Sequence, residues 1–230
     1  VVTDVDLSFR ANFGDEPLIM NQEYDYDDDL KLFFSKFNFY ISDLALLTED
    51  CISGQIELTD IELIDFTDIN TSDQAARDGF RLKFTNIPTG EYAGIRLSIG
   101  VSPELNREEP AVFSTSHPLG NPSQYWEGWK SYIFSKVEGR ADTDQDGSFD
   151  LGYAYHMGGN AAFREICLLK NISLQEDQRT ELDLNIDLRQ LFITDDTTFD
   201  IETTPGTHTE EGLNTSVLLM DNFEEAFDIE

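Results

Sequence analysis

The stretch ELDLNIDL at residues 181–188 places leucine or isoleucine at every second position, with a polar or charged residue between them. Because successive side chains of a β-strand point to opposite faces, this spacing predicts a strand with one buried and one solvated face. Breaks such as IPTG at 87–90 separate similar runs. The alternation recurs at residues 5–13, 37–41, 80–85 and 95–101. About eight such runs, with no helix-length pattern between them, predict an all-β fold, an antiparallel β-sandwich.

The C-terminal segment has a different period. Leu213, Val217, Met220, Phe223 and Phe227 recur at helical spacing, which predicts one short C-terminal helix at about 214–227.

Two long stretches, 102–128 and 139–160, carry only weak patterning. Loops of this length in a compact domain usually serve a function, so we expect both to be long functional loops. The chain length suits one β-sandwich domain over residues 1–230.

Acidic residues dominate the charge, with 46 Asp and Glu against 15 Lys and Arg and a formal net charge of −31. This excludes nucleic acid as an electrostatic partner, because that binding needs clustered cations to neutralise phosphates. Hydrophobic residues make up 40% of the chain and include 17 Phe, enough for a sizeable core.

No apolar run reaches the roughly 18 residues of a transmembrane helix. The chain starts at Val1 without a leader, and we expect an exported protein whose targeting segment was removed.

The two cysteines, Cys51 and Cys167, are far apart and show no CxxC spacing. They form either one long-range disulfide or two buried thiols.

The sequence contains three histidines, and two of them, His117 and His156, fall in the weakly patterned stretches among aromatic residues. Imidazoles in such surroundings are either metal ligands or ordinary hydrogen-bonded or exposed side chains. The third, His208, follows TTPGT just before the expected helix.

Five short motifs occur in a fixed order: HPL at 117–119, YW at 125–126, Tyr132, KVEG at 136–139 and YHMGG at 155–159. Together they resemble the signature of the MbnP-like family, methanobactin-associated copper-binding proteins of bacterial periplasms and outer membranes. The upstream segments FYISDL at 39–44, IELID at 61–65, GEY at 90–92 and IGV at 99–101 match that family's strands in the same order. The resemblance therefore covers nearly the whole chain.

The resemblance implies a secreted or lipid-anchored β-sandwich in the bacterial periplasm or on the outer-membrane surface. It implies copper held by histidine imidazoles, in some members together with a tryptophan oxidised to kynurenine. A dihaem partner related to cytochrome c peroxidases is associated with that oxidation, and an outer-membrane transporter is an expected recipient of the copper. We accordingly expect copper capture or delivery rather than enzymatic activity.

Carried over by position, His117 and His156 are the matching histidines and Trp126 is the matching tryptophan, while His208 is a candidate third ligand. Gln124 stands where a Met often precedes the Tyr-Trp pair. The usual Trp-x-Trp becomes Trp126-Glu-Gly-Trp129, which leaves open which tryptophan, if either, is modified.

The altered tryptophan spacing favours an alternative function. In that reading the sandwich is a surface binding or assembly subunit without copper, which engages a protein or glycan through the aromatic loop at 121–132.

A second candidate metal site is the stretch DTDQDGSFD at 142–150. It matches the first part of an EF-hand-type calcium loop, because acidic oxygens fall at positions 1, 3, 5 and 9 and glycine at position 6. Tyr153 occupies position 12, where a bidentate Glu is expected, so the alternative is a merely acidic turn. The candidate calcium ligands are Asp142, Asp144, Asp146, Ser148 and Asp150.

Overall fold

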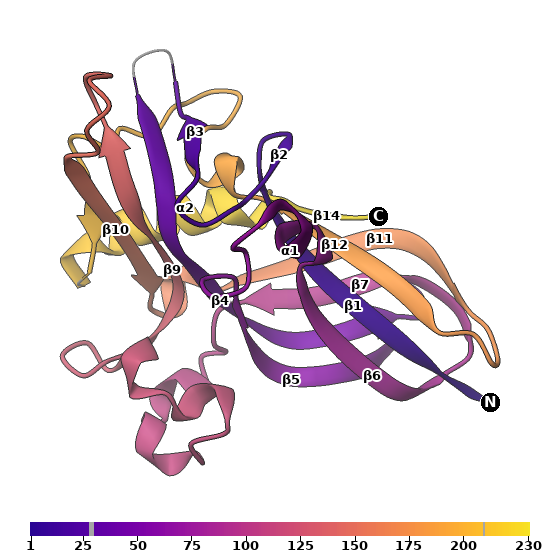
Figure 1. Ribbon diagram of the computed structural model, residues 1–230. Helices are drawn as coiled ribbons and strands as arrows, with labels where there is room; N and C mark the ends of the chain where they lie inside the picture. Colours follow the sequence, from indigo (N-terminus) through magenta and orange to yellow (C-terminus); the bar gives the residue numbers. More distant parts are fainter. Residues whose placement is uncertain (28–29, 209) are drawn as a thin grey trace.

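The computed structural model describes residues 1–27, 30–208 and 210–230, and its strands form two sheets (Figure 1). The smaller sheet has the order β14 (Phe227–Ile229), β12 (Thr180–Asp187), β1 (Val2–Phe13) and β2 (Glu16–Pro17), with β6 (Phe80–Pro88) also paired to β1. The larger sheet runs β11 (Arg164–Leu174), β7 (Gly90–Ile99), β4 (Lys31–Leu47), β9 (Ser131–Asp142), β10 (Leu151–Gly158) and β13 (Gly206–Thr207). Three further strands branch from it: β3 (Glu23–Asp25) and β5 (Gln55–Asp65) from β4, and β8 (Tyr125–Trp126) from β9.

The period-two prediction is confirmed in β12, where Leu182, Leu184 and Ile186 are buried. Each lies opposite an apolar residue of β1; Leu182, for example, pairs with Leu7. The all-β sandwich is therefore confirmed. The sheets are not purely antiparallel, however, since β12 runs parallel to β1 and β13 runs parallel to β10.

Aromatic side chains fill the space beneath the C-terminal helix, α2 (Leu213–Glu224). Phe223 of α2 meets Phe39 of β4 edge-to-face, with ring centroids 5.2 Å apart. Phe37 stacks on Phe66 at 5.4 Å. This packing stabilises α2 far more than the intrinsic preference of so short a helix could.

The helix ends earlier than its spacing predicts. Phe227 belongs to β14 and pairs with Ile186 of β12, so sheet pairing ends the helical pattern at Glu224. A second short helix, α1 (Asp73–Asp78), was not predicted. It begins after Ser72, whose side chain accepts a hydrogen bond from the Ala75 amide.

The expected loop at 139–160 is wrong for most of its length. β9 continues to Asp142 and β10 occupies Leu151–Gly158, so the connection between them is short. Tyr153, Tyr155 and Met157 form the buried face of β10. The glycines of this segment and the combination of tyrosines with a methionine on one face hid this alternation.

The stretch 102–128 does lack long elements and lies at one end of the molecule, in the region coloured magenta to pink in Figure 1. It consists of four 3-10 turns followed by β8: η1 (Leu105–Arg107), η2 (Pro110–Val112), η3 (Pro118–Gly120) and η4 (Pro122–Gln124).

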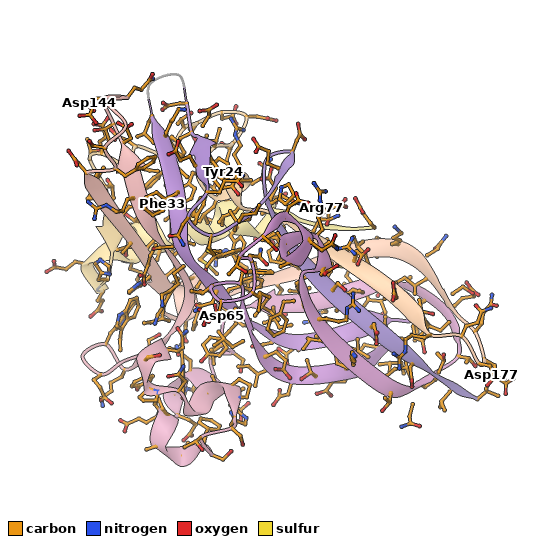
Figure 2. The ribbon with its side chains drawn as sticks, in the orientation of Figure 1. Tyr24, Phe33, Asp65, Arg77, Asp144 and Asp177 are labelled. Carbon is orange, nitrogen blue, oxygen red and sulfur yellow. A yellow bond between two sulfur atoms is a disulfide. The ribbon has the colours of Figure 1, made fainter. Side chains whose placement is uncertain are left out.

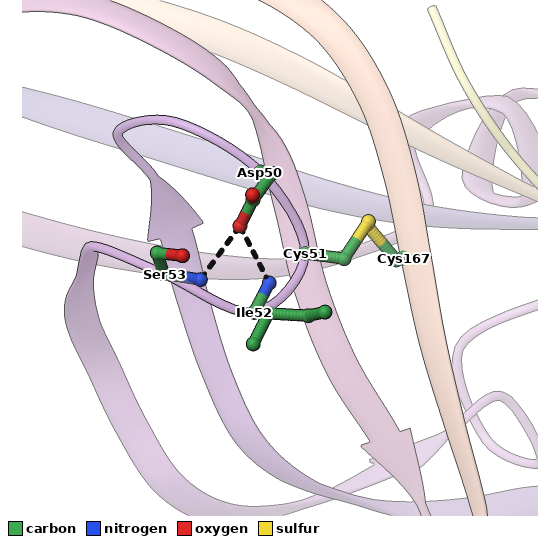
Figure 3. The surroundings of a disulfide bond; sticks show 5 residues. All are labelled: Asp50, Cys51, Ile52, Ser53 and Cys167. Atoms are coloured by element: carbon green, nitrogen blue, oxygen red, sulfur yellow. Dashed lines mark hydrogen bonds between the residues drawn. A yellow bond between two sulfur atoms is a disulfide. The ribbon is translucent and has the colours of Figure 1, made fainter.

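Cys51 and Cys167 form a disulfide, which resolves the two alternatives left by the sequence (Figure 3). Cys51 lies in the turn between β4 and β5, and Cys167 lies on β11. Within the turn, the Asp50 carboxylate accepts hydrogen bonds from the Ile52 and Ser53 amides at 2.9 and 2.7 Å. The disulfide thus ties a hairpin turn to a strand 116 residues away in sequence.

Among the described residues, the structure contains no helix of the length and hydropathy needed to cross a membrane.

Candidate metal centre

Two histidines from distant parts of the chain meet where β13 pairs with β10. Tyr155 lies opposite Thr207 in this parallel pair, so the following residues, His156 and His208, become neighbours. Their Nδ1 atoms are 3.4 Å apart, and the two rings are close to perpendicular, with an interplanar angle of 82°. Metal–nitrogen bonds of about 2.0–2.1 Å at a tetrahedral angle place two ligand nitrogens about 3.3–3.4 Å apart. The pair therefore has the spacing of two ligands on one ion.

A carboxylate fixes the orientation of the His156 ring. Glu138 lies on β9 beside β10, and its Oε1 is 2.8 Å from Nε2 of His156. The carboxylate can only accept, so the proton of a neutral ring resides on Nε2 and the lone pair on Nδ1, which faces His208. Histidine ligands of metals characteristically use their other ring nitrogen in this way.

The surroundings also keep the His156 ring neutral. Its side chain is only 20% exposed, and this burial lowers the pKa of His156 below the usual value. The hydrogen bond to Glu138 acts in the opposite direction, while His208 and Lys136 lower the pKa further. A neutral imidazole is the form that binds metal.

His208 is exposed, but the residues before it are firmly held. The Tyr155 hydroxyl donates to the Thr204 carbonyl at 2.7 Å, and the Ala154 amide donates to the Pro205 carbonyl at 2.9 Å. Thr207 is buried, with its Oγ1 3.1 Å from the Gly212 carbonyl oxygen. These bonds set the position of His208 relative to β10.

Both tryptophans lie beside the histidine pair. Trp126 and Trp129 stack with ring centroids 4.9 Å apart, and the Trp126 ring is 6.5 Å from that of His156. The Trp129 amide donates to the Trp126 carbonyl, so a tight turn folds Trp129 back onto Trp126 despite the altered spacing. The two rings line a groove of about 520 Å³ together with His208 and neighbouring residues: Tyr125, Glu127, Gly128 and Glu210.

The two glycines that follow Met157, Gly158 and Gly159, make room for these rings. A Cβ at Gly158 would lie 3.1 Å from Cζ3 of Trp126, and a Cβ at Gly159 would lie 2.7 Å from Cζ2 of Trp129. The YHMGG motif therefore supplies both a candidate ligand and the space in which the tryptophans stack.

The family model described as MbnP matches residues 2–210 of the chain. The chain belongs to the MbnP family. A structural match is "MbnP from Methylosinus trichosporium", which has a TM-score of 0.57 and 12% sequence identity, and covers 90% of this chain and 83% of that one. At this identity the match supports the shared fold alone. No curated protein matches the chain significantly in sequence.

Within this MbnP-family fold, His117 occupies a different position from the other two histidines. It precedes η3, and its Nδ1 accepts a hydrogen bond from the Leu119 amide at 3.1 Å. Its ring stacks on Phe113 with centroids 4.5 Å apart. An imidazole that accepts at Nδ1 carries its proton on Nε2 when neutral, and this hydrogen bond stabilises the turn at the start of η3.

The three histidines do not form one compact cluster. In the part of the chain that the structure describes, the sole group of three His, Cys, Asp or Glu ligand atoms within 4.8 Å of one another is Asp142, Asp144 and Asp146. The structure thus unites two of the predicted copper residues, His156 and His208, places Trp126 beside them and leaves His117 apart. Of the predicted calcium residues, Asp150 is not in the aspartate group, while Ser148 adjoins it through its amide, which donates to Asp146.

Glu138 is the one residue of this centre that the sequence did not single out. It lies within the KVEG motif, two residues after Lys136 and therefore on the same face of a strand that is otherwise almost wholly buried. A charged residue in that setting is a signal that a polar partner lies on the neighbouring strand.

Proposed function

We propose that this MbnP-family chain is a copper-binding protein of the bacterial cell envelope that captures or delivers copper. The observation that carries the proposal is the 3.4 Å separation of the Nδ1 atoms of His156 and His208, with Nε2 of His156 bound to Glu138. Imidazole nitrogens suit both copper oxidation states. Copper is here the cargo, held by two imidazole rings whose orientation is set by β9, β10 and β13.

Trp126 is the proposed site of oxidation to kynurenine. Its ring contacts His156, so a ketone and an aryl amine formed there would lie next to the histidine pair. An intact indole offers no comparable lone pair. We propose that a dihaem partner related to cytochrome c peroxidases reaches the ring through the groove and catalyses the oxidation, with two molecules of hydrogen peroxide as the oxidant and the lost ring carbon released as formate.

The proposed location rests on the disulfide as well as on the family. Disulfides persist in oxidising compartments such as the bacterial periplasm, and the bond between Cys51 and Cys167 suits that setting. We also propose that the protein resides at the outer-membrane surface through a lipid anchor and transfers copper to an outer-membrane transporter. Its proposed role is binding rather than enzymatic activity.

The groove favours one competing function. Stacked tryptophans beside an open groove also suit the flat face of a sugar ring or an aromatic side chain of a partner. Under this alternative the protein binds a glycan or protein through the aromatic loop at 121–132 and holds no copper.

Metal analysis of protein purified from its native source separates the two functions. The copper proposal predicts copper bound in a near-stoichiometric amount. It also predicts that intact-mass analysis will show a tryptophan that has gained one oxygen atom and lost one carbon atom. Protein without copper that also takes up none on titration would contradict the proposal and favour the glycan or protein partner.

A further inference from the structure

The turn that joins β9 to β10 gathers three aspartates. Ligand oxygens of Asp142, Asp144 and Asp146 all lie within 4.8 Å of one another. Figure 2 labels Asp144 at the tip of this hairpin, far from the 3-10 turns at the other end of the molecule. Three carboxylates at this spacing repel one another unless a cation lies between them.

Asp142 provides an independent sign that a cation belongs here. It is the last residue of β9 and is only 2% exposed. Its Oδ2 accepts a hydrogen bond from the Gly147 amide at 2.9 Å, but its Oδ1 is buried without any hydrogen-bond partner. Across the described residues, no Lys or Arg forms an ion pair with it. A buried carboxylate oxygen is normally hydrogen-bonded or coordinates a metal, so the unpaired Oδ1 of Asp142 is a candidate metal ligand.

The flanking cations are engaged elsewhere. The Arg140 guanidinium donates to the carbonyls of Phe149 and Asp150, at 2.5 and 2.9 Å, and so binds the far end of the turn. Lys31 lies opposite Asp142 in the β4–β9 register, but its Nζ is 3.6 Å from Asp25. Neither of these two side chains therefore forms an ion pair with the aspartate group.

We propose that this turn binds one calcium ion through Asp142, Asp144 and Asp146. A set of oxygen ligands alone selects a hard cation, and the 1-3-5 spacing with Gly147 at position 6 is that of a calcium loop. The backbone already has the required curvature, since the Ser148 amide donates to Asp146 at 2.7 Å. The bound ion would fix the end of β9 and the start of β10, the two strands that carry Glu138 and His156.

The affinity is expected to be low. Position 12 is Tyr153, which is buried and donates its hydroxyl proton to the Phe33 carbonyl, so no bidentate carboxylate comes from there. Sites with few charged ligands bind calcium with dissociation constants of about 10⁻⁴–10⁻³ M. Such a site suits an extracellular or periplasmic ion supply.

Calorimetry and thermal unfolding of the full chain, freed of metal by a chelator and kept free of copper, test the site with calcium chloride as the probe. We expect one calcium per chain and a rise in Tm of about 3–6 °C at about ten times Kd. Asp142→Asn should abolish both effects, and Asp144→Asn should weaken binding at least about tenfold. Asp196→Asn, which removes the same charge from an exposed turn elsewhere, should bind calcium as the wild type does.

Three results would overturn the proposal: no calcium binding by the wild type, equal binding by Asp144→Asn, or an equal Tm rise with magnesium. Asp144 is exposed, so its variant remains informative even if Asp142→Asn does not fold. The aspartates are separate from the histidine pair, and a failure here would leave the copper proposal standing.

Discussion

The Nδ1 atoms of His156 and His208 lie 3.4 Å apart although 52 residues separate the two histidines in sequence. No local motif produces this contact. It depends on the short parallel pairing of β13 with β10, which is held by the Tyr155 hydroxyl on Thr204. The candidate copper site therefore exists only where β13 pairs with β10, and substitutions on either side of this pairing should change its affinity for copper.

Replacing Glu138 by Gln should weaken copper binding about 10–100-fold, because the neutral amide can donate as well as accept and so no longer fixes the tautomer of His156 or raises its basicity. The folded state should change little. A competition titration against a copper chelator measures the effect. Glu127→Gln, on the exposed side of the same groove, is the matched control and should retain the wild-type affinity. Equal losses in both variants would mean that Glu138 acts only through the general charge of the groove.

The pH dependence of stability should reveal the lowered pKa of His156. Burial places the folded-state pKa below the unfolded-state value of about 6.5, so the unfolded state binds more protons between these two values. The free energy of unfolding should therefore fall as the pH drops through that window. Urea unfolding of metal-free protein at several pH values measures the slope. A variant such as His156→Asn should show a smaller slope, and an unchanged slope would argue against a buried, neutral ring.

Substituting Gly159 by Ala should disturb the tryptophan pair. Gly159 has a φ of +85°, and its added Cβ would lie 2.7 Å from Cζ2 of Trp129. Strain and overpacking should lower the free energy of unfolding by about 1–3 kcal/mol, with a change in tryptophan fluorescence. Gly128→Ala is the control from the same groove, since nothing lies within 4 Å of its added Cβ. If the two variants behave alike, Gly159 does not shape the pair.

Removing the disulfide with Cys51→Ala and Cys167→Ala should lower the free energy of unfolding by about 2–5 kcal/mol, because the unfolded chain loses a cross-link that spans 116 residues. Chemical denaturation with and without a reductant measures this. The reductant should destabilise the wild type and leave the double variant unchanged. Copper affinity should survive in the double variant, since the disulfide joins the β4–β5 turn to β11, whereas His156 lies on β10 and His208 directly follows β13.

The fold was largely predictable because its strands follow simple alternation. Apolar and polar residues alternate strictly over residues 181–188, and buried and more exposed side chains alternate in the same way along β12. β10 was missed because its buried face combines tyrosines with a methionine while glycines flank it, which blurs the period. The end of α2 was misplaced because Phe227 satisfies the helical spacing and also the pairing of β14 with β12.

The candidate site was only partly predictable. The motif around His156 supplied one candidate ligand and the segment before α2 supplied another, His208, but their contact depends on long-range pairing that no local pattern encodes. Glu138 was overlooked because its role appears only when β9 and β10 lie side by side. His117 fits the family motif, and in the structure its Nδ1 accepts a hydrogen bond from the Leu119 amide. Its role as a copper ligand stays a prediction.

The most direct test of the account compares the copper(I) affinities of His208→Ala and His117→Ala with that of the wild type, measured anaerobically by chelator competition. The account predicts a loss of at least about tenfold in His208→Ala, since losing a ligand should cost no less than losing a hydrogen-bond partner of a ligand, and a smaller loss in His117→Ala. Wild-type affinity in His208→Ala together with a large loss in His117→Ala would contradict the pairing of His156 with His208 as the centre of the site.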